Sequence, residues 1–125
     1  MTTDEELTEE LVGDVPVVHI DGEVDISNWL RVATTITDAT EREGPGLVVD
    51  LRRTRYLDSS GVRLLFEARR RLQADDRPLV LVTIVGTPAE SVLRHTGLLD
   101  VVPTVTTVDQ AVALLVEASQ GDLRT

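Results

Sequence analysis

Short runs of valine, leucine and isoleucine alternate along this chain with segments whose apolar residues recur at helical spacing. The runs occupy residues 15–20, 47–51, 79–85 and 101–105, and a helical pattern follows each of them. Such alternation is typical of an α/β domain, because each helix returns the chain to the same end of a mainly parallel sheet. The sequence therefore predicts an α/β fold with a mainly parallel sheet and about four helices.

The core of this domain has to be built almost without aromatic rings. Aromatic residues make up 2% of the chain and apolar residues 42%, so valine, leucine, isoleucine and alanine must fill the interior. That composition suits parallel strands covered by helices. The run at residues 79–85 is predicted to be central and buried on both faces, and Trp29 and Phe66 are expected in the core. A length of 125 residues fits one domain.

Several residues mark where the elements begin and end. Pro16 places the first run near a sheet edge, because proline lacks the N–H that a sheet interior requires. A helix is expected to start near Ser27, which can cap it. Thr-Pro-Ala-Glu at residues 87–90 and Thr-Val-Asp-Gln at residues 107–110 are capping boxes that open two more helices, the second reaching about residue 117. Gly97 suits the left-handed position that ends the first of these.

One turn has the character of a site. A short loop at residues 52–57 leads from an apolar strand to Asp58, Ser59 and Ser60, after which a helical pattern begins at once. Two hydroxyls thus stand at a helix N-terminus, where unpaired N–H groups and the helix dipole favour an anion or a covalently attached phosphate. Asp25 also follows a strand, so it is predicted to reach the same rim of the sheet.

The rest of the composition excludes several classes of function. Twenty-two acidic against twelve basic residues give a net charge of −10, which argues against nucleic acid or an anionic membrane as a partner. The chain has no cysteine and its two histidines lie far apart, so no metal site and no cofactor are expected. Nucleotide-binding glycine motifs and a Gly-x-Ser-x-Gly elbow are missing, so catalysis is not expected. The acidic first residues favour a cytoplasmic protein.

Three stretches around this turn carry a family resemblance. Residues 57–62 (Leu-Asp-Ser-Ser-Gly-Val), with the strand at residues 47–51 before them, resemble the signature of the STAS (sulfate transporter and anti-sigma factor antagonist) domain. Residues 22–25 and 96–98 fit the same pattern. The resemblance covers roughly residues 12–116 and implies a single STAS domain with a four- to five-stranded sheet and helices largely on one side. Residues 11–118 are assigned to this domain, residues 1–10 to an acidic flexible N-terminus and residues 119–125 to a flexible C-terminus, although residues 9–12 could add an edge strand.

The resemblance is to the free-standing bacterial anti-sigma factor antagonists, and it implies a partner-switching regulator of transcription. In that family the unphosphorylated antagonist binds an anti-sigma factor that is also a serine kinase, and the sigma factor is released. Phosphorylation of the serine that corresponds to Ser59 switches binding off, and a serine/threonine phosphatase restores it. A monomer or weak dimer is expected. The residues assigned to partner binding are Asp25, Asp58, Ser59, Ser60, Gly61, Arg63, Glu67 and Arg70.

Other interpretations of the same residues stay open. Ser59 is also a favourable plain N-cap, and Asp58 could serve only to shape the turn or cap the helix. Arg63, Glu67 and Arg70 form a helix face that could simply be solvated, with ion pairs from Glu67 to Arg63 and to Arg71. A STAS subunit of a stress-signalling or lipid-transport assembly and a small-molecule sensor are alternative functions.

Overall fold

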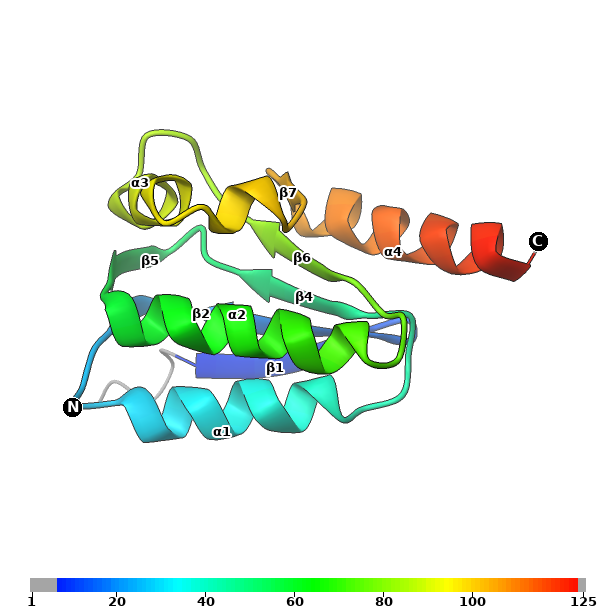
Figure 1. The fold of residues 1–125 in the computed structure, drawn as a ribbon, viewed down its shortest axis with the longest axis horizontal. Coiled ribbons are helices and arrows are strands. Elements are labelled where there is room, and N and C mark those ends of the chain that lie inside the picture. The colour runs from blue at the N-terminus through cyan, green and yellow to red at the C-terminus, as the bar shows by residue number, and fades with distance from the viewer. Residues whose placement is uncertain (1–6, 124–125) are drawn as a thin grey trace.

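The computed structural model of the protein describes residues 7–123, with side chains described for residues 7–120. Figure 1 shows helices stacked against a twisted sheet. In chain order the elements are β1 (Leu7–Val12), β2 (Val15–Ile20), β3 (Gly22–Val24), α1 (Trp29–Thr40), β4 (Leu47–Asp50), β5 (Thr54–Leu57), α2 (Ser59–Gln73), β6 (Leu79–Val82), α3 (Pro88–His95), a 3₁₀ turn (Leu98–Asp100), β7 (Thr104–Val105) and α4 (Val108–Leu123).

The main sheet has five strands in the order β1-β2-β4-β6-β7. Strands β2, β4, β6 and β7 run parallel to one another, and β1 is an edge strand that pairs antiparallel with β2. A separate parallel pair, β3 with β5, continues beyond this sheet. The mainly parallel α/β fold predicted from the sequence is therefore confirmed.

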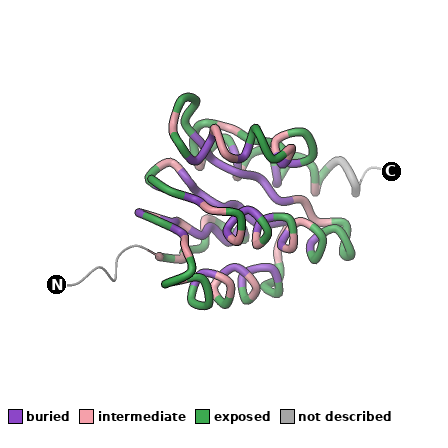
Figure 2. Tube along the Cα trace, turned by 60° about the vertical axis from the view of Figure 1, so that its left-hand side comes forward, coloured by how far each residue is buried: buried purple, intermediate pink, exposed green. Residues whose placement is uncertain are grey.

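Helices cover the two faces of the sheet unequally. One large core joins the inner faces of α1, α2 and α3 to the sheet through side chains such as Ile36, Leu65 and Leu93. On the opposite face α4 packs alone, with Ala111 and Leu115 against valines of β2, β4 and β6. Figure 2 shows the buried stretches concentrated in the strands and in the inward sides of the helices. The expected arrangement, with helices largely on one side, is confirmed.

Two of the predicted caps are present. The Thr87 hydroxyl accepts a hydrogen bond from the Glu90 N–H at 3.3 Å, and the Thr107 hydroxyl accepts one from the Gln110 N–H at 3.1 Å. Gly97 has φ = +84°, the left-handed conformation expected after α3. Local sequence signals therefore define these boundaries correctly.

The predicted termini need correction. Residues 7–10 were assigned to a flexible acidic tail but belong to β1, where the Glu9 carboxylate pairs with Arg42. At the other end α4 continues to Leu123, beyond residue 117, so residues 119–123 are helical. Residues 1–6 and 124–125 of the predicted tails lie outside the described residues.

Three further expectations about the elements are met only in part. Pro16 lies in β2, which is next to the edge strand but not itself an edge; proline is tolerated because β2 pairs with β4 only from Val17 onward. The run at residues 79–85 is buried throughout β6, as predicted, but it leaves the sheet after Val82, and Val85 is 78% exposed. Helix α1 starts at Trp29, two residues after Ser27, but Ser27 is not its cap, and the N-cap residue Asn28 makes no side-chain capping bond.

Trp29 and Phe66, both expected in the core, are each 37% exposed. The buried stripe of α2 runs through Val62, Leu65, Ala68 and Leu72, which leaves Phe66 at its margin. Trp29 is the first residue of α1, at the rim of the sheet, where no further layer covers it. The core thus relies on aliphatic side chains even more than the composition suggested.

A substitution at Gly46, just before β4, tests how closely the backbone packs at this edge of the core. A Cβ at this position would lie 2.4 Å from the backbone oxygen of Pro78, and backbone cannot move aside cheaply. We expect Gly46→Ala to lower the free energy of unfolding by about 2–3 kcal/mol, measured by urea denaturation. The control Gly13→Ala also replaces a glycine of positive φ, +62° against +159° at Gly46, but it has open space around its Cβ. It should cost about 1 kcal/mol, and equal losses would contradict the packing argument.

Candidate functional site

The candidate site stands where β3 and β5 end side by side. Val24 pairs with Leu57 in this parallel pair, and the Asp58 N–H donates to the Val24 carbonyl at 3.3 Å. Asp25 and Asp58 therefore leave neighbouring strand ends at one rim, as the sequence predicted. The strand that positions Asp58 was not predicted, because residues 54–57 were assigned to a loop.

Asp58 is the N-cap of α2. One of its carboxylate oxygens, Oδ1, accepts hydrogen bonds from the backbone N–H groups of Ser60 (3.0 Å) and Gly61 (3.1 Å) and from the Ser60 hydroxyl (2.6 Å). These bonds, the Ser60 hydroxyl first among them, lower the pKa of Asp58 against the opposing effect of burial. Asp58 is therefore an anion at neutral pH and is fixed in place.

The two serines at the start of α2 differ in accessibility. Ser59 is the first residue of the helix, its side chain is exposed, and no described residue forms a hydrogen bond with its hydroxyl. Ser60 is half-buried and its hydroxyl is engaged by Asp58 at 2.6 Å. Of the two hydroxyls, only that of Ser59 is both exposed and without a hydrogen-bond partner among the described residues.

Asp25 is held by an arrangement like that of Asp58. Its Oδ1 accepts hydrogen bonds from the backbone N–H of Ser27 at 2.9 Å and from the Ser27 hydroxyl at 2.6 Å. The hydroxyl bond is the largest contribution that lowers the pKa of Asp25. The Asn28 side chain ties the same loop together, donating to the Glu23 carbonyl at 2.6 Å and accepting from the Asp25 N–H at 3.1 Å.

Sequence reasoning missed Ser27 and Asn28 as parts of this site. The signal that could have found Ser27 is the repeated pattern Asp-x-Ser, which occurs after Val24 and again after Leu57. Both copies fold into a turn in which the aspartate accepts from the serine two residues on. No comparable pattern marks Asn28.

Gly61 contributes by lacking a side chain. A Cβ there would lie 2.5 Å from Leu57 Cδ1 and 3.1 Å from Val24 Cγ1. The first turn of α2 consequently rests directly on the ends of β3 and β5. Gly61 was predicted to contact a partner, but it is buried, and its contribution is to let the first turn of α2 pack closely on the strand ends.

The exposed face of α2 carries the remaining candidates. Arg63 and Arg70 are exposed and Glu67 is half-buried. An Arg70 Nη2 donates to both oxygens of the Glu67 carboxylate at 2.6 Å, a pair spaced by three residues. The pairs predicted from Glu67 to Arg63 and to Arg71 are not among the ion pairs formed by the described residues, so the interpretation of their spacing was wrong.

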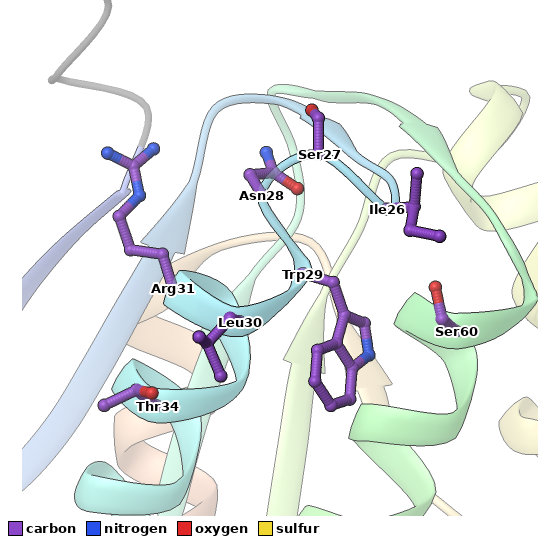
Figure 3. A pocket seen from close by; sticks show the side chains of 8 residues that line it. All are labelled: Ile26, Ser27, Asn28, Trp29, Leu30, Arg31, Thr34 and Ser60. Carbon is purple, nitrogen blue, oxygen red and sulfur yellow. The ribbon is translucent and has the colours of Figure 1, made fainter.

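An open depression borders these residues between the N-terminal ends of α1 and α2 (Figure 3). Its volume is ≈ 1020 Å³, and its lining residues include Ile26, Trp29, Leu30 and Ser60. The Trp29 ring fills the space between the two helices, and Ile26 stands above the Ser60 hydroxyl. The depression is a broad surface feature beside Asp25, unlike the enclosed apolar pocket that a small-molecule sensor would need.

In the part of the chain that the structure describes, both histidines contact groups other than Asp25, Asp58 and Ser59. His19 contacts Asp50 at 2.8 Å and Glu10 at 2.6 Å, and His95 contacts the Ser91 carbonyl at 2.7 Å. Among the described residues, no three histidine, aspartate or glutamate side chains come together as metal ligands. No helix within the described part of the chain is long and apolar enough to cross a membrane.

Comparison with known proteins identifies the family to which this fold belongs. The sequence model of the STAS domain matches residues 7–111, which is most of the chain. The chain belongs to the STAS domain family. This STAS protein matches no curated protein sequence.

Solved STAS structures superpose well on the chain. An anti-sigma factor antagonist of Mycobacterium paratuberculosis is 25% identical with a TM-score of 0.80, covering 87% of this chain and 92% of its own. A variant of RsbS from Moorella thermoacetica is 24% identical with a TM-score of 0.75, covering 93% and 99%. The phosphorylated Bacillus cell fate determinant SpoIIAA is 22% identical with a TM-score of 0.67, covering 87% and 98%.

The cap on α2 makes a testable contribution to stability. We expect Asp58→Ala to lower the free energy of unfolding by about 1–2 kcal/mol at pH 7, because two backbone N–H groups lose their acceptor. Asp58→Asn keeps an acceptor and should lose less. The exposed Asp109, in the first turn of α4, offers the control Asp109→Ala, expected to change stability by about 0.5 kcal/mol or less.

The same cap sets a pH dependence. Because folding lowers the pKa of Asp58 below its usual value of 3.8, its ionised form stabilises the fold above that pH. This contribution disappears as the pH falls through the lower folded-state pKa. The stability difference between wild type and Asp58→Asn should therefore shrink below about pH 4 in urea denaturation. A difference that is constant from pH 7 to pH 2 would contradict the pKa shift.

Proposed function

We propose that this STAS protein is an anti-sigma factor antagonist that binds a cognate anti-sigma factor with serine kinase activity and thereby frees a sigma factor. It acts by binding and not by catalysis. Its place of action is the cytoplasm, where ATP is present for the kinase. The observation that carries the proposal is the exposed Ser59 hydroxyl, which has no hydrogen-bond partner among the described residues and directly follows the fixed carboxylate of Asp58. The likeness to a mycobacterial anti-sigma factor antagonist supports it.

Ser59 is the proposed phosphate acceptor. A kinase has to place the γ-phosphorus of ATP beside the attacking oxygen, so an exposed hydroxyl is required. Ser60 satisfies this poorly, because its hydroxyl is half-buried and donates to Asp58. In the transfer, the bond from the γ-phosphorus to its bridging oxygen breaks, a bond to Ser59 Oγ forms, ADP leaves and the hydroxyl proton passes to a base of the kinase.

A phosphate on Ser59 would change the surface far more than the fold. It brings about −1.5 to −2 charges at pH 7. The N-terminus of α2 tolerates this charge and contributes about 0.3–1 kcal/mol of stabilisation. Structures of SpoIIAA in its unphosphorylated and phosphorylated forms both match this chain with a TM-score of 0.67, which supports a switch without refolding.

The effect on a partner is repulsion. Asp25 and Asp58 are already ionised at this rim, and each hydrogen-bonded carboxylate is held in position. A partner surface that approaches two carboxylates closely cannot also accommodate a dianion without rearranging, and like-charge contacts at an interface cost several kcal/mol, on the order of a hundredfold in affinity. A phosphatase of the serine/threonine type would reset the switch.

We propose that the partner covers the rim and the exposed face of α2 that follows it. The contact residues are Asp25, Asp58, Ser59 and Ser60 at the rim, and Arg63, Glu67 and Arg70 along the helix. Gly61 serves the same surface indirectly, because the absence of its side chain lets α2 sit low on the strand ends. The Glu67–Arg70 pair is exposed and weak, so both side chains are available to rearrange against a partner.

Capture experiments with three baits test the switch. Wild type, Ser59→Ala and Ser59→Asp are immobilised, and bound proteins from the source cells are identified by mass spectrometry. We expect Ser59→Ala to retain a protein kinase of the anti-sigma factor type and Ser59→Asp to lose it by on the order of a hundredfold. Ser60→Ala is the matched control and should still be phosphorylated, at Ser59, by the captured kinase with ATP. Equal capture by the Ala and Asp baits would refute the proposal.

Nuclear magnetic resonance tests the claim that the fold is unchanged. The backbone amide spectra of the unmodified and the Ser59-phosphorylated protein are compared. We expect shifts confined to residues 24–30 and 57–63, because the phosphate is tolerated by the helix N-terminus and touches no core side chain. Shifts spread through β6 and α4, on the far side of the core, would show refolding and contradict a surface switch.

A further inference from the structure

The rim contains two corners of the same construction. In each, a short strand ends at an aspartate whose carboxylate accepts from the backbone N–H and hydroxyl of the serine two residues on, at 2.9 and 2.6 Å for Asp25 and 3.0 and 2.6 Å for Asp58. The residue between aspartate and serine is exposed in both corners. In the second corner it is Ser59, and in the first it is Ile26, whose side chain is 90% exposed.

Ile26 belongs to an apolar patch that we define as Ile26, Trp29 and Leu30. Their side chains are 90%, 37% and 70% exposed, and all three line the depression that Ser60 borders (Figure 3). The loop that presents Ile26 is tied by the Asp25–Ser27 and Asn28–Glu23 hydrogen bonds. A contiguous exposed apolar patch, presented on a hydrogen-bonded loop, is typical of a contact surface, whereas a single exposed isoleucine would not be.

We propose that this patch is the apolar anchor of the kinase-type anti-sigma factor, an inference that rests on the proposed function. The partner would insert an apolar side chain between Ile26 and Leu30 against the Trp29 ring. Lysine or arginine side chains around it would meet the acidic rim. The apolar patch supplies most of the binding affinity. The carboxylates of Asp25 and Asp58, together with Ser59, make that binding depend on phosphorylation.

The area that a protein interface buries supports the kinase-type anti-sigma factor as the protein that covers this patch. A stable interface buries about 800 Å² on each partner, which reaches well beyond a single residue. A protein that encloses Ser59 for phosphate transfer therefore also covers the depression beside it, since Ser60, the next residue, lines the same depression as Ile26 and Leu30. Desolvated apolar side chains near the centre of such an interface carry most of its affinity.

The acidic character of the rim supports a partner whose contact surface is basic. Asp25 and Asp58 have lowered pKa values and are anions at neutral pH, and Glu23 is exposed on β3. One cationic residue, Arg31, also lines the depression, so the acidic side of this surface is the rim. The whole chain carries −10. A cationic ring around an apolar side chain matches this surface, whereas an anionic membrane or a nucleic acid does not.

Binding of the purified kinase captured by Ser59→Ala tests the anchor, with Kd measured by calorimetry. We expect Ile26→Ser to weaken binding about tenfold to a hundredfold, by the loss of one buried isoleucine. The matched control is Leu11→Ser, an apolar residue on β1 that is 60% exposed and lines a different depression. It should leave Kd within about twofold, since it lies outside the proposed surface.

Salt dependence separates the anchor from the charged rim. The defect of Ile26→Ser should be the same in low and high salt, whereas that of Asp25→Asn should shrink as salt rises, because salt screens exposed charges only. Trp29 is the one tryptophan of the chain, so its fluorescence reports directly on the patch. Kinase binding should shift its emission to the blue and protect it from acrylamide, with Trp29→Phe as the blank.

The outcomes distinguish this inference from the function on which it rests. If Ile26→Ser binds as tightly as wild type while Ser59→Asp fails to bind, the anchor is refuted and the switch survives. Unchanged Trp29 quenching in the complex would also refute it. If Ser59→Ala and Ser59→Asp bind equally, the proposed switch is refuted, and an Ile26→Ser defect would still establish the anchor for that partner.

Discussion

The carboxylate of Asp58 is the connection on which the functional surface depends. It holds two backbone N–H groups and a hydroxyl at the start of α2, while the backbone N–H of the same residue bonds to Val24 on the neighbouring strand. One residue therefore fixes the start of the helix, the strand pair and the Ser60 hydroxyl relative to one another. Without this connection Ser59 would stand on a frayed helix end, and its position relative to Asp25 would vary.

The parallel sheet makes such a rim possible. Strands β2, β4 and β6 are buried and closely packed, so the exposed polar groups that can contact a partner lie in the segments that follow the strand ends. The few polar groups in the interior are bonded, as in the Asp50 carboxylate that accepts from Arg52 and contacts His19. The described residues contain no buried side-chain polar atom without a partner. The interior is therefore fully hydrogen-bonded as well as closely packed, and under the proposed function a phosphate at the rim would change what the surface attracts without disturbing this interior.

Prediction from sequence succeeded where one local signal determined the outcome. The caps at Thr87 and Thr107 and the buried strand β4 follow from residue type and spacing alone. Strand β5 was missed because only Thr54 and Leu57 are buried while Arg55 and Tyr56 face solvent, a pattern too short to distinguish from a loop. Trp29, expected in the core, lies exposed at the rim, because hydrophobicity says nothing about which layer covers a residue. Ile26 gave no signal, since its significance comes from the folded turn around it.

The two aspartate-serine turns also bear on how fast partners can be exchanged. Their hydrogen bonds lie entirely within this chain, so the loops lose their conformational freedom during folding and not when a partner arrives. An encounter then needs only correct orientation and desolvation, and no slow loop closure precedes it. If the proposed switch operates, the rate of partner exchange would be governed by phosphate addition and removal and by dissociation, because the loops of the rim are ordered before any partner binds.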